Sequence, residues 1–127
     1  PTRPPGMSMA IAHFAVGAMA TALLLALVAP RLLRSPTVLV VGGIWGMLPD
    51  VHWVLPTGSA LVRSFHMTAW ANVFWFHHYL DGADPGDSPA FAAGLVVLLV
   101  VVLAFCELLT RTGTVPTAAS PVESGHE

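Results

Sequence analysis

Apolar residues gather in three long runs along the chain, at 9–29, 37–55 and 90–109. Each run is close to the about 20 residues that a helix needs to cross a hydrocarbon layer about 30 Å thick. The first run contains one ionisable side chain, His13, and the third contains one charged side chain near its end, Glu107. We therefore expect an all-α fold, a polytopic bundle of helices embedded in a membrane.

The second run carries its polar residues at its end, where Asp50 and His52 follow Pro49. Within the run, Gly42 and Gly46 have the small-xxx-small spacing that lets two helices approach closely. We expect this run to pack against another span through the two glycines.

Segment 61–80 has the length of a span but contains an arginine, an asparagine and three histidines. As one helix at about 100° per residue, it would place Arg63, His66, His77 and Asp81 on one face beside an apolar stripe. Aromatic residues are frequent here, as they are at membrane interfaces. The pattern predicts an amphipathic helix that lies in the interface, re-enters the membrane or crosses it.

These alternatives give different topologies. If 61–80 crosses, the chain has four spans. If it lies in the interface or re-enters, the chain has three, and Arg31, Arg34 and Arg111 share one side of the membrane. The bias of arginine toward the cytoplasmic side favours three spans.

The two ends of the chain differ from the membrane domain, 9–110. Segments 1–8 and 111–127 are rich in proline and small polar residues, and we expect both to be disordered. Arg3 precedes the first apolar run, as in a signal peptide. That run is too long for a typical signal and lacks a clear cleavage site, so we expect it to be a retained span.

Composition supports the membrane assignment, because 55% of the residues are hydrophobic and 9% are charged, against about a quarter charged in soluble domains. The five basic residues and a net charge of -2 leave no basic surface for nucleic acid. The single cysteine, Cys106, cannot form an intramolecular disulfide. The expected partners are the lipid bilayer and either a second copy of the chain or another membrane protein.

Histidines and aspartates lie near the ends of the runs. His13 is one turn inside the first run, and Asp50 and His52 are at the exit of the second. Consecutive spans run in opposite directions, so these residues reach the same membrane face. Imidazole nitrogen and carboxylate oxygen are ligands of zinc at about 2 Å. Because ionisable groups at membrane depth are costly, their presence indicates a function.

His77 and Asp81 are four residues apart, which places both on one helical face, where they could hold the same ion. His66 would lie about 16 Å from His77 along a continuous helix, too far to share a metal. Either the helix breaks between them or His66 has another role. A single site that includes His77 and Asp81 requires that 61–80 does not cross the membrane.

Three motifs occur in order: H-x-x-x-G from His13, G-x-L-P-D ending at Asp50, and H-x-x-L-D from His77 to Asp81, which D-P-G follows. Together they resemble the bacterial and archaeal family of membrane-bound metal-dependent hydrolases of the LexA-regulated inner-membrane type. That family is itself similar to zinc-dependent phospholipases C. The resemblance covers about 12–86 and implies a multi-pass protein of a prokaryotic cell membrane.

The chain departs from that family pattern in two places. The family usually has D-x-D after the proline. This chain has His52 in place of the second aspartate of that motif. A family element H-R-x-x-T-H-S is shortened here to the residues around His66, and the span that usually follows it is missing. These departures favour a non-catalytic protein.

Three functional hypotheses follow. The first is a hydrolase in which zinc-activated water attacks a phosphoester or ester near the lipid headgroups. Its predicted metal ligands are His13, Asp50, His52, His77 and Asp81, and its predicted catalytic proton carriers are His66 and His78. The second is a non-catalytic membrane subunit that binds a partner. The third is a haem-binding or proton-handling protein, since two histidines on facing helices can ligate haem.

Overall fold

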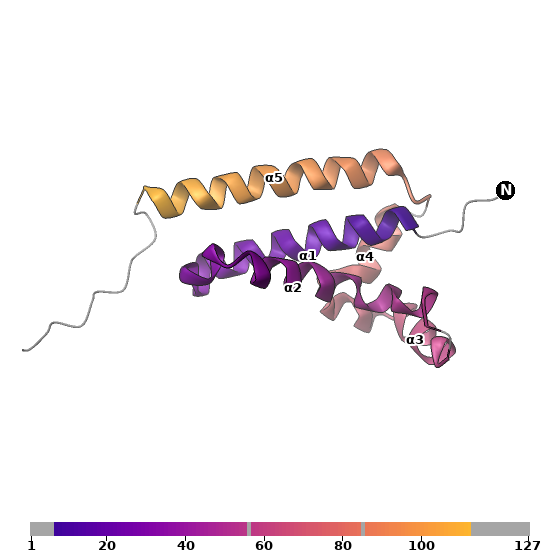
Figure 1. Cartoon of the computed structure of the whole chain (residues 1–127). Coiled ribbons are helices and arrows are strands. Elements are labelled where there is room, and N and C mark those ends of the chain that lie inside the picture. Colours follow the sequence, from indigo (N-terminus) through magenta and orange to yellow (C-terminus); the bar gives the residue numbers. More distant parts are fainter. Residues whose placement is uncertain (1–6, 56, 85, 113–127) are drawn as a thin grey trace, which may run out of the picture.

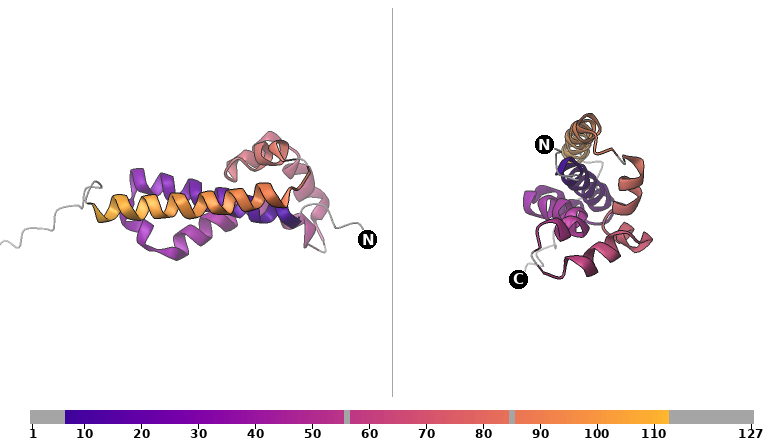
Figure 2. Two further views of the ribbon diagram at one scale, coloured as in Figure 1. Left: turned by 90° about the horizontal axis from the view of Figure 1, so that it is seen from above. Right: turned by 90° about the vertical axis from the view of Figure 1, so that its right-hand side faces the viewer.

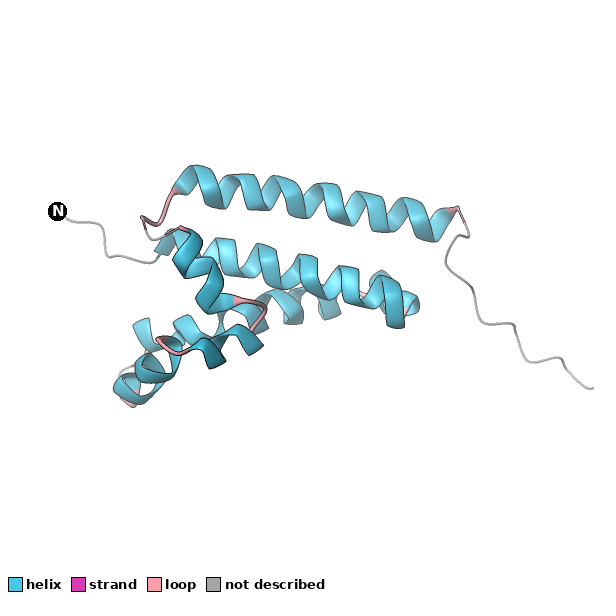
Figure 3. Cartoon of the chain, turned by 180° about the vertical axis from the view of Figure 1, so that it is seen from behind, coloured by secondary structure: helices cyan, strands magenta, loops and turns pink. Residues whose placement is uncertain are grey.

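The structure is a computed structural model of the chain, and it describes residues 7–55, 57–84 and 86–112. Helices joined by short connections make up this described part (Figures 1 and 3), so the predicted all-α class is confirmed. The α-helices are α1 (Met7–Val28), α2 (Pro36–Met47), α3 (Ser59–His66), α4 (His77–Ala83) and α5 (Pro89–Arg111). Three short 3-10 helices connect them: η1 (Pro30–Arg34), η2 (Leu48–Trp53) and η3 (Ala69–Val73).

The predicted disordered ends are tested only in part. Residues 1–6 and 113–127 lie outside the described residues. At the inner edges of these segments, α1 begins at Met7 and α5 continues to Arg111.

The first and third apolar runs form α1 and α5, and both helices contain a stretch long and apolar enough to cross a membrane. Seen from the end of the molecule in Figure 2, α1 lies between α2 and α5 and packs against both. Its buried apolar side chains are small or flexible, and comprise Ala12, Ala15, Ala18, Met19, Ala22 and Leu25; His13 is buried on the same helix. The centre of the molecule is therefore α1, with a helix on either side.

Glycines bring α1 and α2 into close contact. A Cβ atom added to Gly46 would lie 2.6 Å from the backbone oxygen of His13, and one added to Gly17 would lie 2.5 Å from the backbone oxygen of Gly42. A Cβ at Gly42 would overlap the side chain of Thr21. The close approach expected from Gly42 and Gly46 is therefore confirmed, with α1 as the partner helix.

The second apolar run forms two consecutive helices instead of one. α2 ends at Met47, and the chain continues as the 3-10 helix η2, which contains Pro49. Proline has no N–H to donate to the preceding turn and its ring crowds the carbonyl four residues back, so the α-helix cannot continue unchanged. Because the helix type changes here, the side chains of Asp50 and His52 project from the 3-10 helix and not from a continuation of α2.

Segment 61–80 does not form the continuous helix that we expected. α3 ends at His66, η3 covers Ala69–Val73, and α4 begins at His77. Trp75 and Phe76 have positive φ angles of 52° and 63°, a left-handed conformation that reverses the chain direction. The single polar face predicted for 61–80 is therefore wrong, and this segment contains no helix of membrane-spanning length.

Candidate metal centre

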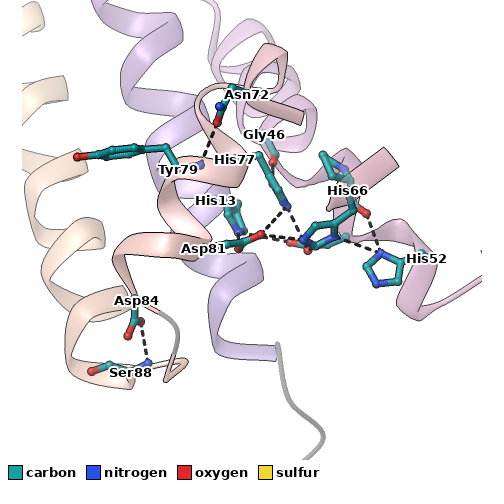
Figure 4. Close-up of polar contacts among 12 residues, drawn as sticks. His13, Gly46, His52, His66, Asn72, His77, Tyr79, Asp81, Asp84 and Ser88 are labelled. Carbon is teal, nitrogen blue, oxygen red and sulfur yellow. Dashed lines mark hydrogen bonds and ion pairs between the residues drawn. The ribbon is translucent and has the colours of Figure 1, made fainter. Parts of the chain in front are cut away.

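Histidines and aspartates from four elements meet at one end of the molecule. His13 comes from the first half of α1, Asp50 from η2 and His66 from the last position of α3. His77 and Asp81 lie on one face of α4. In Figure 4 the side chains of His13, His66, His77 and Asp81 point toward one another.

The Asp81 carboxylate lies at the centre of three imidazoles. Its Oδ1 is 2.9 Å from His13 Nε2, and its Oδ2 is 2.7 Å from His66 Nε2. The same Oδ2 is 3.7 Å from His77 Nε2. All three histidines therefore turn the same ring atom, Nε2, toward this carboxylate.

The Asp50 carboxylate approaches the cluster from η2. Its Oδ1 lies 3.4 Å from His77 Nε2 and 3.8 Å from His66 Nδ1, and its Oδ2 lies 3.8 Å from His13 Nε2. Two sets of three potential ligand atoms result, one from His13, Asp50 and His77 and the other from His66, His77 and Asp81. Within each set, all ligand atoms lie within 4.8 Å of one another.

A hydrogen bond to the backbone fixes the tautomer of the His77 ring. Its Nδ1 is 2.9 Å from the backbone oxygen of Gly46, and because a carbonyl oxygen only accepts, Nδ1 carries the hydrogen. In the neutral ring, Nε2 then carries a lone pair directed at the carboxylates. This outer hydrogen bond is the usual support of a metal-ligating histidine.

Three buried side-chain atoms of the cluster residues lack hydrogen-bond partners among the described residues: His13 Nδ1, His77 Nε2 and Asp50 Oδ2. His77 Nε2 also lies 3.4 Å from Asp50 Oδ1. A lone pair and a carboxylate oxygen repel each other when they converge away from water, and an unpaired buried polar group is costly. A cation between them removes both penalties. The residues present therefore fit a bound metal ion.

The charges in the cluster shift the protonation of two residues. The hydrogen bond with Asp81 raises the pKa of His66 against the effect of burial, and the charges of Asp81 and Asp50 add to the rise. Burial acts to raise the pKa of Asp81, but hydrogen bonds with His13 and His66, and the attraction of positive charge on His77 or His13 when those rings are protonated, hold it well below its usual range. Asp81 is therefore ionised and stabilises positive charge on its neighbours.

The structure brings most of the predicted site residues into the cluster. His13, Asp50, His77 and Asp81 are together in the cluster, and the break after α3 brings in His66, which groups with His77 and Asp81 as a potential ligand.

The other two predicted residues lie outside the two sets of ligand atoms. His52 lies beside them, with Nδ1 2.8 Å from the oxygen of Pro49 and 3.4 Å from His66 Nδ1. His78 forms no hydrogen bond or ion pair with the described part of the chain.

Two residues that support the cluster were not predicted as site residues. The side-chain oxygen of Asn72 accepts a hydrogen bond from the N–H of Tyr79 at 2.9 Å, which caps the first turn of α4. Trp45 Nε1 donates to the backbone oxygen of Val73 at 3.2 Å, and the Trp45 ring lies 4.7 Å from that of Phe74. An asparagine five residues before a helix and a tryptophan in an apolar run carry no sequence pattern that predicts these contacts.

Comparison with protein-family models, curated proteins and solved structures gives no match. The resemblance to membrane-bound metal-dependent hydrolases stays a prediction. The functional argument therefore depends on the geometry of the cluster.

Proposed function

We propose that the chain is a membrane-embedded, metal-dependent hydrolase that holds one divalent ion at the His/Asp cluster. The observation that carries the proposal is the approach of His77 Nε2 to the Asp50 carboxylate, whose Oδ1 lies 3.4 Å away. His77 Nε2 and Asp50 Oδ2 are both buried and lack hydrogen bonds among the described residues. Three imidazoles and two carboxylates form a mixed nitrogen and oxygen donor set, for which zinc is the best-fitting ion.

One ion fits the cluster better than two. Both sets of ligand atoms use His77, and its Nε2 has one lone pair, so it can bind one ion. The stacked rings of His13 and His77, with centroids 3.7 Å apart, also argue against haem. Haem ligation requires two imidazoles that point at each other from opposite sides of a porphyrin.

A bound zinc ion would supply Lewis-acid activation of water. The site is open to solvent on the side of Asp81, whose side chain is 29% exposed. The Asp50 side chain is 14% exposed, and those of His13 and His77 are 1% exposed or less. His66, hydrogen-bonded to Asp81 and 12% exposed, is placed to accept and return a proton there. This exposed edge favours hydrolysis over a purely structural ion in a non-catalytic subunit.

The arrangement supports three spans. α2 contains 12 residues and η2 contains 6. An α-helix rises about 1.5 Å per residue and a 3-10 helix about 2.0 Å, so together the two helices are about 30 Å long, which matches the thickness of the hydrocarbon layer. With α1 and α5 they place Arg31, Arg34 and Arg111 at one end and the cluster at the other. By the positive-inside bias, the cluster faces the outside of a prokaryotic cell membrane.

The segment around the cluster carries large exposed apolar side chains, which include Leu61, Trp70 and Tyr79, exposed by 79%, 74% and 73%. Aromatic residues with a polar edge favour the headgroup layer. Segment 59–83 therefore suits the membrane surface, and a phosphoester or ester of that layer is the proposed substrate.

Metal analysis tests the proposal. Detergent-purified protein should contain close to one equivalent of zinc by mass spectrometry, and a His77→Ala, Asp81→Ala double variant should contain little. His78→Ala is the matched control, since His78 is adjacent on α4 and makes no polar contact with the cluster. Carefully handled protein without metal would overturn the proposal. Metal without hydrolysis of phosphoester or ester probes would instead establish the non-catalytic alternative.

A further inference from the structure

A cavity lies at the opposite end of the molecule from the cluster, between the start of α2 and the last turns of α5. Its volume is about 390 Å³, within the roughly 300–1,000 Å³ of ligand pockets. Leu39 of α2 and Leu103 and Cys106 of α5 form apolar walls. Arg34, Glu107 and Thr110 add polar groups to the lining.

The polar groups of this lining differ in whether they have partners. Glu107 forms an ion pair with Arg111, and Thr110 Oγ1 donates to the backbone oxygen of Glu107 at 2.8 Å. Arg34 forms no ion pair or hydrogen bond with the described residues, and neither does Arg31 on the same short helix, η1. The cavity therefore combines apolar walls with one guanidinium group, that of Arg34, which is unpaired within the described part of the chain. Arg31 lies three residues before it on η1, and side chains three residues apart on a 3-10 helix lie on the same face.

We propose that this cavity binds an anionic phospholipid, with an acyl chain against the apolar walls and the phosphate on Arg34, and with Arg31 on the same helix adding positive charge beside it. Guanidinium binds phosphate through two parallel hydrogen bonds. The walls favour a lipid over a free anion, because Leu39, Leu103 and Cys106 offer nothing to a small hydrated ion. The proposal rests on the membrane placement of the helices and is independent of the metal chemistry.

Native mass spectrometry tests the arginines. The detergent-purified chain is titrated with phosphatidylglycerol and with phosphatidylcholine of the same acyl chains. Phosphatidylglycerol should be retained preferentially, and an Arg31→Ala, Arg34→Ala variant should lose that preference by about tenfold. Arg63→Ala is the control, because Arg63 lies on α3 at the other end of the molecule. Equal retention of the two lipids by the unaltered chain would overturn the proposal.

A second variant tests the cavity with the arginines intact. Leu103→Trp should fill the space and reduce phosphatidylglycerol retention, whereas Val100→Trp, at a position 61% exposed on the same helix, should not. Zinc content, measured in parallel, should be the same in all variants. Unchanged retention in Leu103→Trp, or full displacement of the lipid by inorganic phosphate, would contradict a lipid in this cavity.

Discussion

The Asp50 carboxylate is unfavourable for folding in the absence of a cation, and it would become favourable if an ion were bound. Its Oδ2 is buried without a hydrogen bond among the described residues, and its Oδ1 is 3.4 Å from the lone-pair nitrogen of His77. Without a cation, this arrangement is unfavourable. Residues that are costly in the fold and acceptable with a ligand are typical of functional sites.

Asp50→Asn removes the charge and keeps the shape. We expect zinc affinity to fall by at least about tenfold. In the presence of a chelator, we expect the free energy of unfolding to stay the same or rise by up to about 1 kcal/mol, because one of two neighbouring charges is gone. Thermal unfolding in detergent, with chelator and with zinc, separates the two effects. Equal destabilisation under both conditions would show that Asp50 has an ordinary structural role.

At the scale of elements, the spacing of α1 and α2 and the metal cluster depend on the same glycine. Gly46 allows α2 to contact the backbone of His13, and its own carbonyl oxygen accepts the hydrogen bond from His77. A change at this position therefore alters the positions of two ligands at once.

Gly46→Ala should separate the two helices, since its Cβ would lie 2.6 Å from the His13 oxygen. Overpacking of this kind costs about 1–3 kcal/mol, and we expect reduced zinc content as well. Gly94→Ala is the matched control, because a Cβ there meets nothing within 4 Å and alanine favours a helix by up to about 1 kcal/mol. The prediction fails if both variants unfold at the same temperature.

Asn72 supports α4 by capping it from a distance. Asn72→Ala should cost about 1 kcal/mol, the usual value of an N-terminal cap, and should lower zinc affinity by loosening His77 and Asp81. Asn72→Asp keeps the acceptor oxygen and adds a negative charge that suits a helix N-terminus, so it should restore both properties. Zinc titration of the two variants checks this, and equal affinity of Asn72→Ala and the unaltered chain would contradict it.

The sequence predicted the long elements and most of the site for clear physical reasons. Long apolar runs predict α1 and α5 because hydrophobicity over about 20 residues has few other interpretations, and the antiparallel course of the first two runs predicts that His13 and Asp50 lie at one end. A break between His66 and His77 was left open but could not be located from the sequence, because part of it depends on Trp75 and Phe76, two aromatic residues with positive φ angles. Tertiary contacts such as the Trp45 to Val73 hydrogen bond hold that turn, and local sequence does not report them.

At the scale of the whole molecule, the site and the arginines occupy opposite ends. In Figure 1, the C-terminal end of α5 lies at the same end as the connection between α1 and α2, away from α3 and α4. If α1, α2 with η2, and α5 cross a bilayer, every connection near the cluster faces one side.

Cysteine labelling in intact cells tests this topology. In a Cys106→Ala background, Thr57→Cys and Ala83→Cys should react with a membrane-impermeant maleimide added outside, because both positions are exposed and lie near the cluster. Leu32→Cys, in η1 at the other end, should react only after the cells are opened. Labelling of positions 57 and 83 from different sides would disprove the three-span arrangement and the single site with it.

The cluster also sets the order of biogenesis. His13 and Asp81 are 68 residues apart in the chain yet bonded side chain to side chain. The complete set of potential ligands therefore does not exist until the ribosome has released α4, long after α1 and α2 have been synthesised. If the chain binds the proposed ion, the ion can therefore be bound by the complete ligand set only after α1 and α2 have already been synthesised.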